Sequence, residues 1–198
     1  MTRPTPTETS RSPLSRPVAF AVVLLGAAFV FLRMTPGLVE WNLVPLGALA
    51  LFSAARLRGV WAFAIPVGLR LVTDLVVWGQ FDFVYPPFDP FTYAALAVTL
   101  YLGVRLRRTP NPLWIGGMAL GSSVAFFLVT NFGAWVMQAM PYPRTAAGLL
   151  LAYEQGLPFF RPQLFGELLG VGLLFASHAA LASAYSRSEL PRPAGAEA

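Results

Sequence analysis

The sequence contains no lysine and no cysteine, and it has a single histidine, His178. Without lysine, neither a Schiff base nor a phosphate-binding loop ending in Gly-Lys-Ser/Thr can form. Without cysteine there is no disulfide and no thiolate ligand, and a lone histidine argues strongly against a zinc site. We therefore expect no metal site and no bound cofactor.

The sequence also lacks the motifs of common hydrolases. It has no Gly-x-Ser-x-Gly elbow and no His-Glu-x-x-His motif. Ser177 and His178 are adjacent, so on a helix they point in different directions and cannot act as nucleophile and base. We expect a protein that is not an enzyme.

Charged residues are scarce, at 12% of 198 residues against about 25% in ordinary globular domains, while 56% are hydrophobic. This composition predicts an integral membrane protein built as an all-α bundle. We expect one transmembrane domain over residues 17–185. A disordered tail (1–16) should precede it, and a flexible tail (186–198) should follow it.

Six apolar runs indicate about six transmembrane helices. The fifth run is long for one span, and Gly133 favours a break or a tilted extension near residues 131–133. Residues 79–90 are rich in proline and aromatics, as expected of an interfacial loop. The runs cover residues 17–32, 43–55, 60–78, 91–104, 113–140 and 163–185.

The arginines predict the orientation in the membrane. Six spans would place ten of the 14 arginines on one side, which the positive-inside rule assigns to the cytoplasm. Both termini would then be cytoplasmic, with the chain in the cytoplasmic (inner) membrane, and residues 131–160 would face outward. The arginines flank apolar runs, so the expected partner is the lipid bilayer and not a nucleic acid. The ten are Arg3, Arg11, Arg16, Arg56, Arg58, Arg105, Arg107, Arg108, Arg187 and Arg192.

Residues 131–160 are the predicted substrate-binding region. If Asn131 begins a helix, then Asn131, Trp135 and Gln138 share one face, on which two amides and an indole meet. The alternatives are that Trp135 belongs to an interfacial aromatic belt and that Asn131 satisfies backbone groups at a helix end. Proline breaks at 140–143 and 156–158 would bracket a short segment with two further candidates, Tyr153 and Glu154, although Glu154 would equally suit a solvated surface.

Two further acids are predicted to contribute to the site. Asp74 lies four residues after Arg70, which permits an ion pair on one helix face. Charged residues inside a membrane face the protein interior or a watery cavity, so a structural pair and a substrate contact are equally consistent with this spacing. Glu167 lies near the start of the last apolar run. Glu167 and Asp74 are candidates for binding substrate, and these two acids and Glu154 are candidates for binding a coupling proton or a cation.

Small residues gather in the second apolar run at Gly47, Ala50 and Ala54. Small residues four apart let helices approach closely in lipid. Packing within the chain is the commoner reason for such a pattern, and a docking face for a partner subunit is the alternative.

Six further motifs can be read from the sequence: Asn42-x-x-Pro45-x-Gly47, Thr73-Asp74, Thr130-Asn131-Phe132-Gly133-x-Trp135, Tyr142-Pro143-x-Thr145, Pro158-Phe159-Phe160 and Gly166-Glu167-Leu168. Together they resemble a family of bacterial membrane proteins similar to the substrate-binding S subunits of energy-coupling-factor (ECF) vitamin transporters. The resemblance covers roughly residues 40–180. Where that family often has Asp after the last glycine, this chain has Glu167.

This resemblance implies a six-helix S-component-like bundle with an outward-facing pocket for a vitamin-like or heterocyclic small solute. It also implies a transmembrane coupling subunit and cytoplasmic ATPases as partners, with Gly47, Ala50 and Ala54 as the docking surface. The expected function is substrate binding for membrane uptake. Gradient-driven or uncoupled uptake and a non-transporting scaffold or assembly partner remain the alternatives.

Overall fold

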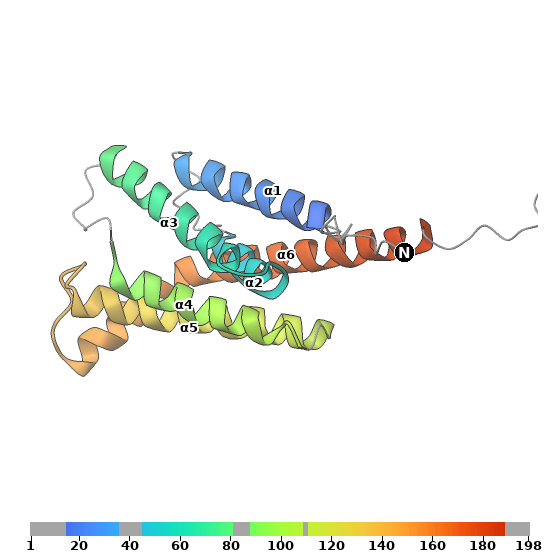
Figure 1. The fold of residues 1–198 in the computed structure, drawn as a ribbon. Helices are drawn as coiled ribbons and strands as arrows, with labels where there is room; N and C mark the ends of the chain where they lie inside the picture. The colour runs from blue at the N-terminus through green and yellow to red at the C-terminus, as the bar shows by residue number, and fades with distance from the viewer. Residues whose placement is uncertain (1–14, 36–44, 81–87, 109–110, 189–198) are drawn as a thin grey trace, which may run out of the picture.

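The computed structural model describes residues 15–35, 45–80, 88–108 and 111–188, which form six α-helices (Figure 1). No strand occurs in these ranges, which confirms the all-α prediction. Three helices contain stretches long and apolar enough to cross a membrane. The helices are α1 (Ser15–Met34), α2 (Leu46–Arg56), α3 (Trp61–Gln80), α4 (Pro90–Arg105), α5 (Pro112–Val136) and α6 (Ala146–Ser188).

Most of the two predicted tails and most of the predicted loop lie outside the described residues. Residues 15–16, placed in the first tail by the sequence, belong to α1, and residues 186–188 belong to α6. Of the predicted loop, residues 79–80 end α3 and residue 90 begins α4.

Proline and its preceding polar residue fix the start of two helices. The Asp89 carboxylate accepts hydrogen bonds from two backbone N–H groups at the start of α4, at 2.9 and 3.3 Å. The Asn111 side chain accepts one at the start of α5, at 2.9 Å. Pro90 and Pro112 follow them, at a position where the missing N–H would have no helical partner.

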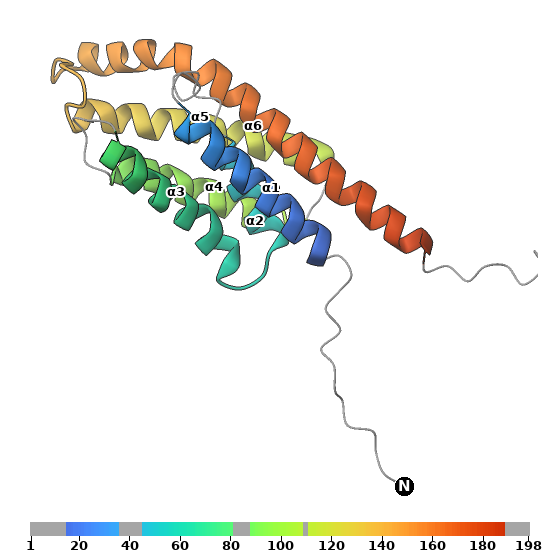
Figure 2. The same cartoon turned by 90° about the horizontal axis from the view of Figure 1, so that it is seen from above.

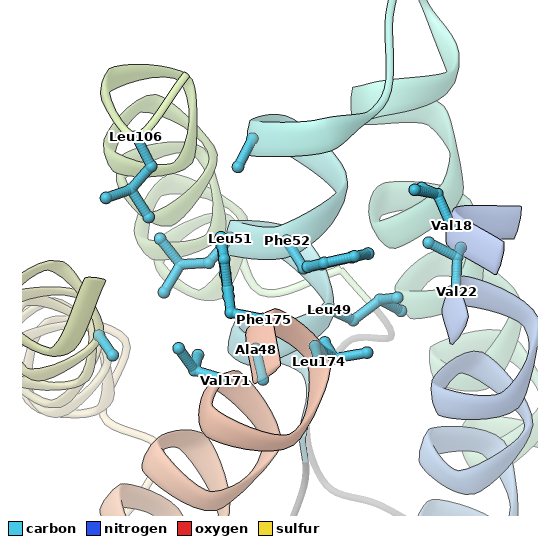
Figure 3. Packing of buried hydrophobic residues seen from close by; sticks show 12 residues of the cluster. Val18, Val22, Ala48, Leu49, Leu51, Phe52, Leu106, Val171, Leu174 and Phe175 are labelled. Atoms are coloured by element: carbon cyan, nitrogen blue, oxygen red, sulfur yellow. The ribbon is translucent and has the colours of Figure 1, made fainter. Parts of the chain in front are cut away.

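The shortest helix, α2, lies at the centre of the bundle and packs against all five others. Nine of its 11 residues are buried. Its length of about 16 Å is half the ~30 Å of a hydrocarbon core, so α2 is a core element surrounded by longer helices. Figure 3 shows side chains of α2 meeting those of α1 and α6, among them Leu49, Leu51, Phe52, Val18, Val22, Val171, Leu174 and Phe175.

Glycines bring α2 into backbone contact with its neighbours. A Cβ added at Gly103 of α4 would lie 2.7 Å from both the Ala54 Cβ and the Leu51 carbonyl oxygen. One added at Gly170 of α6 would lie 2.8 Å from the Ala48 Cβ. Both distances are too short for any side chain, so the closeness of the helices depends on these glycines.

The predicted docking residues lie inside the bundle. Ala50 and Ala54 have no exposed surface, and Gly47 faces the carboxyl group of Glu167. These three positions therefore cannot form an exposed docking face. They fit the alternative interpretation, in which the small residues pack against other helices of the same chain. The physical reason is that small side chains on a central helix allow the surrounding helices to approach its backbone closely.

Arg107, just beyond α4, holds the C-terminal end of α2. Its Nε donates to the carbonyl oxygen of Ala54 at 2.6 Å, and its Nη2 donates to that of Leu57 at 2.9 Å. The last carbonyls of a helix have no partner within the helix, and a cation there is favourable to the helix dipole. Arg107, which belongs to another segment, thus supplies hydrogen-bond donors to carbonyl groups at the end of α2.

The helix α5 continues through Asn131 to Val136, so the break predicted at residues 131–133 is wrong. Gly133 is required for close packing instead, because a Cβ there would lie 2.4 Å from Cγ of Phe91 in α4. The chain leaves the helix a few residues later, at Gln138, whose φ of +54° lies in the left-handed region.

The second predicted proline break is also wrong. Residues 156–158 lie within α6, a 43-residue helix that contains Pro158 and Pro162 in its interior. Each proline removes one helical hydrogen bond, the usual cause of a kink, and α6 changes direction along its length in Figure 2. Packing against α5 keeps the chain helical across both prolines.

The close approach at Gly103 predicts that Gly103→Ala destabilises the protein by about 1–3 kcal/mol, because the added methyl group meets backbone that cannot move freely. Thermal unfolding in detergent, followed by tryptophan fluorescence, measures the change. Gly117→Ala is the matched control in α5, where a Cβ meets nothing within 4 Å. Equal loss of stability in the two variants would contradict the packing argument.

Candidate functional site

One polar pocket lies among the described helices, and every helix contributes to its wall. Its volume is about 50 Å³, enough for a few water molecules or a small polar group. Polar side chains are rare inside a membrane bundle, and they gather at functional sites. The lining residues are Arg33 of α1, Leu46 and Gly47 of α2, Arg70 of α3, Thr99 of α4, Ser122, Ser123 and Phe126 of α5, and Gln163 and Glu167 of α6.

Asp74 holds the two arginines that line this pocket. Arg70 Nε donates to Asp74 Oδ2 at 2.7 Å, which confirms the predicted ion pair. Arg33 Nη2 donates to the other carboxylate oxygen, Oδ1, and the Tyr93 hydroxyl donates to Oδ2 at 3.0 Å. One carboxylate therefore joins α1, α3 and α4, and two positive charges share its single negative charge.

Glu167 is 4% exposed and lies against the start of α2. A Cβ at Gly47 would lie only 2.2 Å from Glu167 Oε2, so the glycine makes room for the carboxyl group. The backbone N–H of Ala48 donates to this carboxyl group, and Pro45 supplies no side-chain cap. Glu167 therefore caps α2 from α6, a position at which the helix dipole favours a carboxylate.

The remaining hydrogen bond to Glu167 is a shared one. Ser122 Oγ lies 3.3 Å from Glu167 Oε1 and 2.9 Å from the carbonyl oxygen of Ala119. A hydroxyl has one hydrogen, so it serves the nearer acceptor better. The two oxygens of a carboxylate have about four acceptor positions, so Glu167 keeps capacity to accept from a molecule in the pocket.

Two buried polar atoms of the pocket residues have no hydrogen-bond partner among the described residues. They are Arg33 Nε and Ser123 Oγ, and Ser123 is 2% exposed. Buried polar atoms in native proteins are almost always paired, so each such atom requires a partner. A ligand or water in the pocket would supply one.

Asn131 and Trp135 share a face near the end of α5, as their spacing predicts, but Asn131 does not begin a helix and Gln138 lies beyond the helix end, so the predicted three-residue face is incomplete. Asn131 Nδ2 donates to the carbonyl oxygen of Phe127 at 2.8 Å, and Trp135 Nε1 donates to that of Pro143 at 2.9 Å. Gln138 lies beyond the helix and donates to the carbonyl oxygen of Trp135. All three side chains donate hydrogen bonds to nearby backbone carbonyl groups, and none lines the pocket.

Tyr153 and Glu154 also lie outside the pocket. The Tyr153 hydroxyl donates to the carbonyl oxygen of Leu128 at 3.2 Å, which ties α6 to α5. Glu154 is exposed, as in the solvated alternative. Of the predicted substrate residues, only Glu167 lines the pocket, and Asp74 acts there through the two arginines that it binds.

Sequence reasoning missed several pocket residues. Arg33, at the end of the first apolar run, was not among the predicted site residues, whereas its guanidinium turns inward to Asp74. A signal was available for two others, because Ser122 and Ser123 are adjacent hydroxyl residues inside a long apolar run. The other polar residues missed are Thr99 and Gln163, and the apolar residues missed are Leu46 and Phe126.

A model described as "Family of unknown function (DUF6580)" matches residues 12–191. The chain belongs to this family. No curated protein and no solved structure matches the chain. The DUF6580 description specifies no activity, so the similarity to S subunits stays a proposal. The family match covers every helix and therefore the whole pocket.

For this DUF6580 protein, we expect Asp74→Asn to lower the free energy of unfolding by about 3–5 kcal/mol, because it leaves two half-buried arginines without their carboxylate. Tyr93→Phe removes one hydrogen bond to the same carboxylate and should cost about 1 kcal/mol. Thermal unfolding in detergent compares the two. A similar, small effect of both variants would contradict the central role of Asp74.

Trp135→Phe tests the local role of the indole. The variant keeps an aromatic ring but loses the N–H that binds Pro143. We expect faster amide hydrogen exchange in residues 137–145, measured by mass spectrometry, because one hydrogen bond holding this turn is gone. Exchange in the helices around Ser122 and Glu167 should stay the same, and a change there would show that Trp135 supports the pocket.

Proposed function

We propose that this protein is the solute-binding subunit of a membrane uptake system and that the polar pocket is its binding site. The observation that carries the proposal is that all six helices contribute to one pocket with arginine and glutamate side chains in its wall. Charged groups are costly within a membrane, and they are typical of substrate and ion pathways. The ion pairs of Asp74 could also serve a scaffold, whereas Glu167, which has no ion-pair partner among the described residues, favours a binding site.

The position of the pocket suits capture from outside. It lies where α1 ends, at Arg33, and where α2 begins, at Leu46 and Gly47. If six segments span the membrane with cytoplasmic termini, as the arginine distribution predicts, the end of α1 is on the outer side. The two ends of the central α2 would then lie toward the pocket and toward the cytoplasmic arginines.

The solute is a small polar molecule. The heterocycle proposal depended on stacking by Trp135 and on the amides of Asn131 and Gln138, which are engaged with backbone groups. A pocket of about 50 Å³ with arginine, serine, threonine and glutamate in its wall favours a compact solute with several hydrogen-bonding groups.

Energy for uptake would come from partner subunits. The sequence has no phosphate-binding loop and no lysine to contact phosphates, so the chain does not hydrolyse ATP by that route. By analogy with ECF S subunits, we propose a transmembrane coupling subunit and cytoplasmic ATPases as partners. Because the small residues of α2 are buried, the docking surface would use other positions, on the exposed helices.

Native mass spectrometry of protein gently extracted from its own host tests this proposal. We expect a bound small solute that is lost in Glu167→Gln, which removes the charge but keeps the shape of the side chain. Glu154→Gln is the matched control, since Glu154 lies on the exposed surface of the same helix. The extract should also contain the coupling subunit and the ATPases.

The two parts of the proposal fail separately. Solute-free protein in both wild type and control would contradict solute binding and favour the scaffold. Bound solute without any ATPase would retain the binding function and overturn the energy-coupling part, in favour of gradient-driven or uncoupled uptake.

A further inference from the structure

We propose that the pocket binds a small zwitterion, a molecule with a carboxylate and an ammonium group of the kind found in amino acids. This inference rests on the proposed function and adds the chemical class of the solute. The observation behind it is that groups of opposite charge line one pocket without pairing. Arg33 and Arg70 bind Asp74, whereas Glu167 makes no ion pair with any described residue.

The positive part of the wall can bind a carboxylate. Two guanidinium groups share Asp74, which leaves one excess positive charge there. Arg33 also has a buried Nε–H that meets no hydrogen-bond acceptor within the part of the chain that the structure describes. Guanidinium groups form short, directional hydrogen bonds to carboxylates, so a ligand carboxylate would satisfy both the charge and the free donor.

The negative part of the wall can bind an ammonium group. Glu167 is held at the start of α2 beside Gly47 and the Ala48 N–H. An ammonium group next to this buried carboxyl group would favour its charged form. The Glu167 carboxylate retains acceptor positions toward the pocket. An ammonium group has three hydrogen-bond donors and no acceptor, which matches a wall of acceptor oxygens.

Charge balance separates a zwitterion from singly charged solutes. Two arginines and two acids make the pocket region neutral overall when all four groups are charged. A ligand with one net charge would therefore carry an unbalanced charge into a low-dielectric site, which is costly. A zwitterion leaves the net charge of the pocket unchanged. It would also bridge the two arginines and Glu167, which form no ion pair with each other.

Ser123 provides a neutral reporter of occupancy. Its hydroxyl is buried, lines the pocket and has no partner among the described residues. A hydroxyl can donate to a carboxylate or accept from an ammonium group, so it fits either end of the ligand. Ser53 is its matched control, because its hydroxyl is also buried and unpartnered but does not line the pocket.

The test is isothermal titration calorimetry of the purified full-length protein in detergent. The probes are glycine, β-alanine and 4-aminobutyrate, with propionate and propylamine as singly charged analogues. We expect at least one of the three zwitterions to bind at least tenfold more tightly than both analogues. The number of carbon atoms between the two charged groups of the tightest-binding zwitterion would indicate the distance between the arginine side and the Glu167 side of the pocket.

Variants then assign the binding to the pocket. Ser123→Ala should weaken the best zwitterion about three- to tenfold, the effect of one hydrogen bond, while Ser53→Ala should bind like wild type. Glu167→Gln should weaken it tenfold or more and reduce the preference over propionate. Thermal unfolding of each variant shows whether it is folded.

Different failures contradict different claims. If propionate or propylamine binds as tightly as the zwitterions and Ser123→Ala weakens it, the zwitterion inference is overturned and solute binding in the pocket stands. The same conclusion follows if native mass spectrometry finds a solute of another class. If no probe binds and the extracted protein is solute-free, the pocket holds only water, and both proposals fail.

Discussion

Inside a membrane, a charged side chain must find its partner within the protein, and Asp74 meets this requirement for three helices at once. Its carboxylate accepts hydrogen bonds from Arg33 of α1, Arg70 of α3 and Tyr93 of α4. Each of these groups would be costly to bury alone. The cluster therefore fixes the positions of α1, α3 and α4 relative to one another, and it also turns two guanidinium groups toward the pocket.

A second constraint is that glycines must occupy the positions where other groups approach α2 most closely. Glycines at 47, 103 and 170 each leave a space that a neighbouring group fills. At two of them the space is filled by another helix, which gives a dry and tightly packed core. At Gly47 it is filled by a carboxyl group, and this difference places a polar site at one end of an otherwise apolar helix. Packing and pocket thus depend on the same kind of residue.

The sequence predicted what depends on neighbours along the chain. Apolar runs predicted helices, and a spacing of four predicted the pair between Arg70 and Asp74. Arg33 was not predicted as the partner of Asp74, because the two lie 41 positions apart and no local pattern encodes that contact. The aromatic and amide residues at 131–138 have the composition of a binding site, yet they satisfy the backbone where α5 ends. Pro158 predicted a helix end, but neighbouring helices keep α6 continuous.

The two ends of α2 are bound to different segments, and this has a mechanical consequence. Glu167 holds its start, while Arg107 holds its end through the carbonyl groups of Ala54 and Leu57. A short helix with close contacts on several sides has little room to bend, so α2 behaves as a rigid element. The two polar contacts therefore lie about 16 Å apart along one rigid helix, so the pocket end and the arginine-rich end of the bundle are positioned by the same element.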